Sequence, residues 1–187
     1  GVQTCALPIS NHKNKGNLES IRSAKISKAF KTIHLDIYKN TIVLFLSEVL
    51  SKSIKEEEKN TRLFEFIKES LIWLDQSSNF SNFHIHFLVK LLNYLGISPE
   101  KTNLNLGGFN MLEGVFCSYD QSEYCINGRL VDNFKLFLGT DFDANISEIN
   151  SLNKRKELIE FLIKYMQIHL PEFNRPKSLN VLYELFK

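Results

Sequence analysis

The sequence predicts a mainly α-helical fold, a helical bundle that carries a small β-hairpin. Apolar residues recur at helical spacing through most of the chain after residue 35, a pattern typical of helices with one buried face. Short polar stretches separate these segments, which favours an antiparallel bundle. Gly and Pro are scarce, at 8 and 4 of 187 residues, which argues against a fibrous or low-complexity chain.

Residues 17–30 form the first predicted element, a β-strand. Apolar or small side chains alternate there with polar ones, and a period of two is typical of a strand with one buried face. Because a single strand is not stable alone, we expect it to be the last strand of a sheet whose other strands are missing. The preceding residues 1–9, GVQTCALPI, begin without Met and contain no basic signal-peptide region. They resemble a translated sequencing adapter, which predicts a non-native leader.

The helices of the bundle are predicted from Asp36 onward. Asp36 and Ser151 are residue types preferred as N-caps, and Gly96 is a typical C-terminal cap. The first helix is apolar on most sides, which predicts a central position in the bundle. Pro171 and Pro176 separate the last two helices. The predicted helices span residues 36–54, 61–75, 80–95, 128–138, 152–169 and 178–186.

Residues 99–125 interrupt the helical pattern. Pro99 and the pair Gly107-Gly108 predict a loop. The sequence that follows, FNMLEGVFCSY, has the pattern of two short strands around a turn at Glu113-Gly114. We therefore expect a β-hairpin over residues 109–117.

Charge is unevenly distributed along the chain. The net charge is +2, yet residues 11–34 contain six basic side chains and one acidic side chain. A basic arm on a slightly acidic body predicts an anionic partner, and cations interspersed with Ile26 and Phe30 are typical of surfaces that follow single-stranded nucleic acid. A solvated strand and linker is the alternative. The candidate DNA-binding residues are Lys13, Lys15, Arg22, Lys25, Lys28 and Lys31.

The sequence contains no recognisable catalytic or metal-binding constellation. The three cysteines, Cys5, Cys117 and Cys125, form no CxxC pair. His84 and His86 would point about 200° apart on a helix, so we expect partly exposed histidines beside the core and no shared metal ion. No motif assembles a nucleophile, a base and an oxyanion site. We expect no metal and no cofactor, and a protein that is not an enzyme; a small metal-dependent enzyme is the alternative.

Three consecutive cations, Lys154, Arg155 and Lys156, lie at the start of the predicted helix 152–169. Positive charge at a helix N-terminus opposes the macrodipole, which indicates a role in binding a ligand. A solubilising surface is the alternative. No membrane partner is expected, because the longest apolar run, residues 41–46, is far shorter than the ~20 residues that span a bilayer.

The order and spacing of several sequence blocks resemble the RecO family of DNA repair proteins. The resemblance covers residues 12–187, and it rests on the blocks together, since no single one is sufficient. The blocks are TIVLFLSEVLSKSIKEEEKN, LFEFIKESLIWLD, FHIHFLVKLLNYLGISP, FNMLEGVF and the ending HLPEF…KSLNVLYELF.

The resemblance implies two domains. RecO-like proteins have an N-terminal OB barrel followed by a helical domain, so residues 10–34 would be a remnant of the OB fold, with its last strand, and residues 35–187 the helical domain. Some members carry a four-cysteine zinc module among the helices. Only Cys117 and Cys125 occur in the corresponding region, residues 100–127, which implies a member without zinc.

The resemblance also implies a non-catalytic function in DNA repair and recombination, in the bacterial cytoplasm at the nucleoid. RecO proteins bind single- and double-stranded DNA, anneal complementary strands and, with RecR, load RecA onto strands coated by single-strand-binding protein. They bind the acidic, Phe-ended tail of that protein on the helical domain, which requires an apolar pocket rimmed by cations. A helical protein-interaction module without DNA binding is the alternative. From charge alone, the candidate tail-binding residues are Lys90, Lys154, Arg155 and Lys156.

Overall fold

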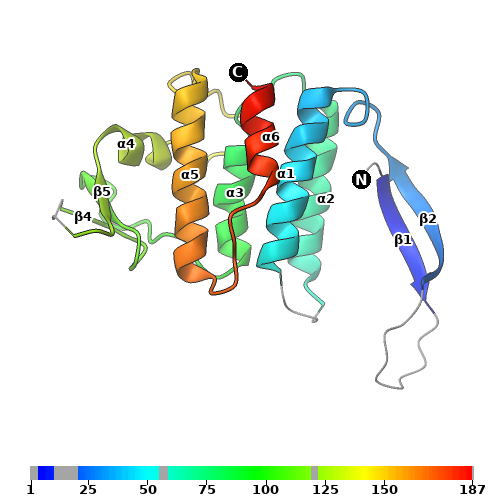
Figure 1. Cartoon of the computed structure of the whole chain (residues 1–187), viewed down its shortest axis with the longest axis horizontal. Helices are drawn as coiled ribbons and strands as arrows, with labels where there is room; N and C mark the ends of the chain where they lie inside the picture. The colour runs from blue at the N-terminus through cyan, green and yellow to red at the C-terminus, as the bar shows by residue number, and fades with distance from the viewer. Residues whose placement is uncertain (1–3, 11–20, 55–58, 119–121, 187) are drawn as a thin grey trace.

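The protein is a helical bundle with a small sheet on either side of it. A computed structural model describes residues 4–10, 21–54, 59–118 and 122–186. In Figure 1 a three-stranded sheet lies beyond α5 and a two-stranded sheet lies on the opposite side, beyond α2. The prediction of a mainly α fold with a small β element is confirmed. The helices are α1 (Ile37–Ser53), α2 (Thr61–Gln76), α3 (Phe83–Tyr94), α4 (Arg129–Lys135), α5 (Leu152–His169) and α6 (Ser178–Leu185).

Side-chain caps fix the starts of α1, α2 and α5. The Asp36 carboxylate accepts hydrogen bonds from the backbone N–H groups of Tyr38 and Lys39, and Ser151 caps α5 through the N–H of Lys154. These side chains satisfy donors that the first turn of a helix leaves without partners. α3 begins at Phe83, three residues later than predicted.

The apolar periodicity predicts the core. In α1, Ile42, Phe45 and Val49 are completely buried, whereas Leu44 is 50% exposed. The predicted central position of α1 is therefore wrong, because only one face of this helix packs against the bundle. A second group of aromatic rings lies where α4 and α5 meet the three-stranded sheet. The Phe134 and Phe161 rings are 4.8 Å apart there in an edge-to-face arrangement, a favoured geometry for aromatic pairs.

The predicted hairpin is confirmed, and the sheet contains one more strand than expected. The strand order is β4-β3-β5, with both pairs antiparallel. The turn requires Gly114, whose φ is +70° and whose Cβ, if present, would lie 2.6 Å from the Tyr165 hydroxyl. The third strand was missed because it pairs with β3 and not with β4, the strand before it in sequence, so no hairpin turn marks it. The strands are β3 (Gly108–Asn110), β4 (Val115–Cys117) and β5 (Cys125–Asn127).

The predicted strand within residues 17–30 is β2 (Ile21–Ala29), and it has a partner in this chain. β1 (Thr4–Ser10) pairs with β2 in an antiparallel register that joins Leu7 to Lys25. The expectation of a strand without a partner in this chain is therefore wrong, because the leader supplies one. A non-native leader at 1–9 and the domain boundaries at 10–34 and 35–187 remain predictions.

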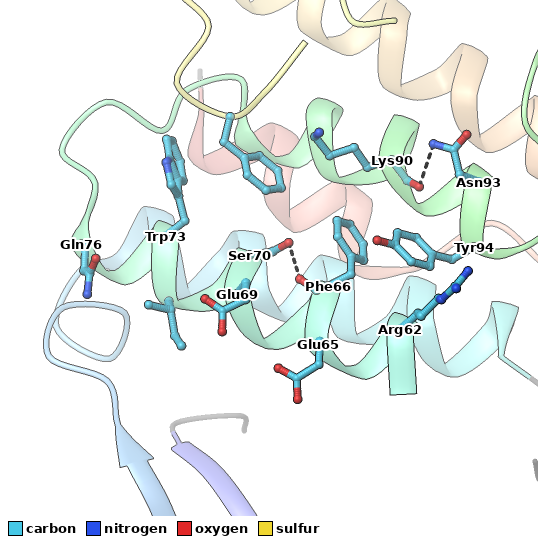
Figure 2. Close-up of a pocket in the computed structure, with 12 residues that line it drawn as sticks. Arg62, Glu65, Phe66, Glu69, Ser70, Trp73, Gln76, Lys90, Asn93 and Tyr94 are labelled. Carbon is cyan, nitrogen blue, oxygen red and sulfur yellow. Dashed lines mark hydrogen bonds between the residues drawn. The ribbon is translucent and has the colours of Figure 1, made fainter. Parts of the chain in front are cut away.

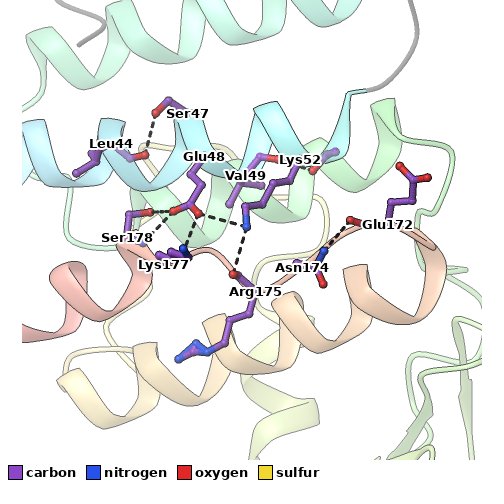
Figure 3. A network of polar contacts seen from close by, with 11 residues as sticks. Leu44, Ser47, Glu48, Val49, Lys52, Glu172, Asn174, Arg175, Lys177 and Ser178 are labelled. Atoms are coloured by element: carbon purple, nitrogen blue, oxygen red, sulfur yellow. Dashed lines mark hydrogen bonds and ion pairs between the residues drawn. The ribbon is translucent and has the colours of Figure 1, made fainter.

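Glu48 in α1 holds the start of α6 (Figure 3). Its carboxylate accepts hydrogen bonds from the Ser178 hydroxyl at 2.6 Å and from the backbone N–H groups of Lys177 and Ser178. Lys52, one turn further along α1, completes the network with a contact of 3.3 Å. A carboxylate at a helix N-terminus also interacts favourably with the macrodipole, so this contact fixes the last helix to the first.

Among the described residues, no helix is long and apolar enough to cross a membrane.

Candidate functional site

The basic arm is partly described by the structure. Lys25 and Lys31 have exposed side chains. Arg22 and Lys28 belong to β2, whose side chains at these positions are not described. The other two candidates, Lys13 and Lys15, lie outside the described residues.

Asp75, at the end of α2, fixes the arm to the helical bundle. Its buried carboxylate accepts hydrogen bonds from the backbone N–H groups of Lys31, Thr32 and Ile33, at 2.7 to 3.1 Å. Burial would raise the pKa of Asp75, but these hydrogen bonds outweigh it and lower the pKa below its usual value. The buried Lys39 amine donates to Thr32 Oγ1 at 2.8 Å and to the Asp75 carbonyl at 3.2 Å. These contacts of Asp75 and Lys39 with residues 31–33, which we call the Asp75 joint, therefore fix the position of the arm.

The two histidines of α3 are buried, so their predicted partial exposure is wrong. His84 and His86 are 2% and 1% exposed, because bundle elements cover both sides of α3. Burial, with the charges of Arg155 and His86, lowers the pKa of His84 to about 3. Burial and Lys90 lower the pKa of His86 to about 4. Both rings are therefore neutral parts of the core at neutral pH.

The structure brings Cys117 and Cys125 together. Their sulfur atoms lie 3.6 Å apart, on β4 and β5 at the two edges of the three-stranded sheet. Two thiols supply half of the four ligands of a structural zinc site. Within the described ranges, no group of three His, Cys, Asp or Glu residues is arranged to hold a metal ion.

Lys90 lines a groove between α2 and α3, the aromatic groove, shown in Figure 2. The groove has a volume of about 830 Å³. The Phe66 and Tyr94 rings stack there with centroids 4.6 Å apart, and Trp73 lies 5.3 Å from the ring of Phe142. Its charged side chains are Arg62, Glu65, Glu69 and Lys90.

The described lining of the aromatic groove carries no excess of positive charge. Lys90 forms an ion pair with Asp141 at 2.7 Å, which neutralises it. Arg62 lines the groove together with Glu65 and Glu69, two carboxylates that form ion pairs with Lys68 at 2.7 and 3.6 Å. An acidic ligand would gain little electrostatic attraction here.

The three consecutive cations at the start of α5 have different surroundings. The Lys154 amine donates to the carbonyl of Glu148 at 2.6 Å. The half-buried Arg155 guanidinium donates to the carbonyl of Ile149 at 3.2 Å. The Lys156 amine lies over the Tyr183 ring, 5.0 Å from its centroid. The structure therefore does not bring the four predicted tail-binding residues to one site, since Lys90 lies at a separate groove.

Lys156 lines a second groove along α5, the α5 groove, with a volume of about 700 Å³. Lys164 and Arg175 line it too, as do the carboxylates Glu157 and Glu160, and Arg175 forms an ion pair with Glu160 at 2.7 Å. Sequence reasoning missed both cations, because Arg175 reaches α5 only through the fold and Lys164 lies two turns beyond the cationic cluster. The apolar lining consists of Met111, Ile126, Leu130, Phe161 and Ile163.

Comparisons with known proteins agree on one family. Residues 34–179 match the family model described as recombination protein O, C terminal. The chain is 38% identical over 178 residues to a DNA repair protein RecO of Christiangramia forsetii, covering 95% of this chain and 74% of the relative. It is 41% identical over 175 residues to that of Flavobacterium johnsoniae, with 94% and 73% covered. It is 33% identical over 189 residues to that of Bacteroides fragilis, with 95% and 75% covered. The chain therefore belongs to the RecO family of DNA repair proteins.

Proposed function

We propose that the protein is a non-catalytic mediator of DNA repair and homologous recombination. In this proposal it binds single- and double-stranded DNA and single-strand-binding protein and, with RecR, promotes strand annealing and the loading of RecA. Membership of the RecO family supports the DNA repair role. The α5 groove, whose described lining has three cations, two carboxylates and an apolar floor, is the observation that supports a docking role for the helical domain.

The acidic, Phe-ended tail of single-strand-binding protein would dock in the α5 groove. A terminal Phe needs an apolar floor, which Phe161, Leu130 and Met111 offer, and acidic residues need cations at the rim. Lys156 and Lys164 offer that charge against the one remaining carboxylate, Glu157, whereas Arg175 is already paired with Glu160. Charge complementarity therefore favours the α5 groove over the aromatic groove.

DNA would bind along the basic arm. Lys25 and Lys31 are exposed, and lysines contact phosphates without reading sequence. Because the Asp75 joint holds the backbone at Lys31, a strand bound along the arm would have a defined orientation relative to the bundle.

A helical protein-interaction module without DNA binding is the competing function. It is favoured by the two grooves, whose described linings include no residue of the arm. Such a module would bind the peptide but would show no salt-sensitive affinity for DNA.

The test is a fluorescence-anisotropy titration of the chain with two labelled probes, a single-stranded oligonucleotide and an acidic peptide that ends in Phe, at low and high salt. The mediator predicts binding of both probes, with DNA affinity falling steeply as salt rises. Peptide binding without DNA binding would support the interaction module instead. Binding of neither probe would contradict both functions.

A further inference from the structure

A polar cavity of about 300 Å³ lies between the start of α3 and the segment that leads into α5. Four asparagines, two serines and one arginine provide its polar lining. Among the described residues that line it there is no carboxylate, and Arg155 is the one charged side chain. We call it the asparagine pocket, and its polar side chains include Asn79, Asn82, Asn145, Asn150 and Arg155.

Arg155 is a half-buried cation without an acidic partner in the described part of the chain. Its guanidinium donates to the Ile149 carbonyl, while its Nε–H is buried with no hydrogen-bond acceptor among the described residues. Burial lowers the pKa of Arg155, a sign that the charge is poorly solvated. A partly desolvated charge is costly unless an opposite charge or hydrogen bonds compensate it. An anion in the pocket would supply that compensation.

The remaining lining is also suited to an anion. Asn82 is the N-cap residue of α3; its side chain makes no capping hydrogen bond, and its Oδ1 is a buried acceptor with no donor among the described residues, which a protonated phosphate oxygen could satisfy. The N-terminus of a 12-residue helix therefore lies at the pocket, with the partial positive charge that such an end carries. The exposed side chains of Asn79, Asn145 and Asn150 add amide N–H donors to the same lining.

We propose that the asparagine pocket binds a phosphate group. A planar guanidinium matches phosphate oxygens in two parallel hydrogen bonds, and the small cavity suits one phosphate with part of its substituent better than a large ligand. Inorganic phosphate and the terminal 5′-phosphate of a nucleic acid strand share this chemistry. Only the second source rests on the proposed DNA-binding function.

The first experiment measures thermal unfolding of the chain with and without millimolar inorganic phosphate, with chloride added to hold the ionic strength constant. Phosphate is expected to raise the Tm by about 3 °C near ten times its Kd. Arg155→Gln should abolish this rise. Lys154→Gln, which removes the same charge one residue earlier but does not line the pocket, should retain it. An equal rise in wild type and Arg155→Gln, or no rise in wild type, would overturn the proposal.

A second variant tests the proposal independently, in case Arg155→Gln does not fold. Asn150 is exposed at the rim, so Asn150→Asp adds a carboxylate near Arg155 without disturbing the core. It should lower phosphate affinity ~10-fold or more, as expected for loss of about 1.4 kcal/mol. Unchanged phosphate affinity in this variant would also overturn the proposal.

The two sources are separated by anisotropy with one oligonucleotide carrying either a 5′-phosphate or a 5′-hydroxyl. Tighter binding of the phosphorylated strand, lost in Arg155→Gln, assigns the pocket to a strand terminus. Equal binding of both strands, together with the phosphate-dependent Tm rise, assigns it to free phosphate. If neither strand binds but the Tm rise persists, the proposed DNA function fails and the pocket remains a phosphate site.

Discussion

The carboxylate of Asp75 accepts a hydrogen bond of 2.7 Å from the backbone N–H of Thr32, 43 residues earlier in the chain. Asp75 is the penultimate residue of α2, and Thr32 lies near the end of the basic arm. This one side chain therefore joins the arm to the helical bundle, and it does so in its ionised form, because its pKa is lowered.

Asp75→Asn should destabilise the protein and loosen the arm. In Asn, an NH2 group replaces one of the two carboxylate oxygens that accept these hydrogen bonds. A donor would then face backbone N–H donors, so we expect a loss of about 2 kcal/mol in the free energy of unfolding. Urea unfolding measures the loss, and limited proteolysis within residues 30–36 measures the loosening. Asp132→Asn, at an exposed carboxylate, is the control. Equal stability of the two variants would contradict the claim that Asp75 holds the arm on the bundle.

Glu48 should make stability depend on acid pH. The pKa of Glu48 is lowered from 4.5 to about 2, because hydrogen bonds from Ser178, Lys177 and Lys52 outweigh the effect of burial. Stability from this group is complete above about pH 4.5 and is lost as pH falls toward 2. Glu48→Gln should cost about 2 kcal/mol at pH 7 and flatten the curve between pH 4.5 and 2. Urea unfolding across this pH range measures the effect. An unchanged slope of unfolding free energy against pH in Glu48→Gln would contradict the role of Glu48.

His84 and His86 should make the stability of the protein depend on pH in a range that begins higher than that of Glu48. Their pKa values fall from 6.5 to about 3 and about 4, so the unfolded chain binds more protons below pH 6.5. Stability from these groups is complete above pH 6.5 and is lost as pH falls toward 4 for His86 and toward 3 for His84. His86→Leu should reduce the slope between pH 6.5 and 4 and leave the contribution of His84. A slope unchanged between pH 6.5 and 4.5 would count against the buried, neutral histidine.

Gly114→Ala should be destabilising, whereas Gly107→Ala should be nearly neutral. A Cβ at Gly114 would meet the Tyr165 hydroxyl at 2.6 Å, and the residue has a φ of +70°. A Cβ at Gly107 would meet no described atom within 4 Å, which makes this glycine the matched control. We expect a loss of ~1–3 kcal/mol for Gly114→Ala, measured by urea unfolding. Similar stability of the two variants would contradict the geometry of the turn.

Lys25→Ala should weaken single-stranded DNA binding and reduce its salt dependence. Removing one phosphate contact lowers the slope of log K against log salt by ~0.7 for single strands. Lys101→Ala, at another exposed lysine, should leave the slope unchanged. Anisotropy titrations at four salt concentrations measure both variants; an equal slope for the two would exclude Lys25 from the DNA contact.

Local patterns predicted most of the fold. The cap at Ser151 and the apolar spacing that follows it are properties of neighbouring residues, so α5 lies where the sequence predicts it. The positive φ of Gly114 likewise follows from the turn pattern.

Long-range packing accounts for what sequence reasoning missed. The burial of His84 depends on helices that pack around α3, and the meeting of Arg175 with Glu160 depends on the turn after α5. The sequence places Arg155 in one cluster with Lys154 and Lys156, whereas in the fold Arg155 lines the asparagine pocket and neither lysine does. Candidate site residues were therefore predicted less well than the helices.

The most direct test of the proposed docking role is a titration of a labelled acidic peptide ending in Phe with wild type and two double variants at one salt concentration. Lys156→Ala/Lys164→Ala removes cations from the α5 groove, and Arg62→Ala/Lys90→Ala removes cations from the aromatic groove. We predict at least ~10-fold weaker binding for the first double variant and wild-type affinity for the second. Wild-type affinity in the first variant, with loss of binding in the second, would contradict the assignment of the acidic tail to the α5 groove.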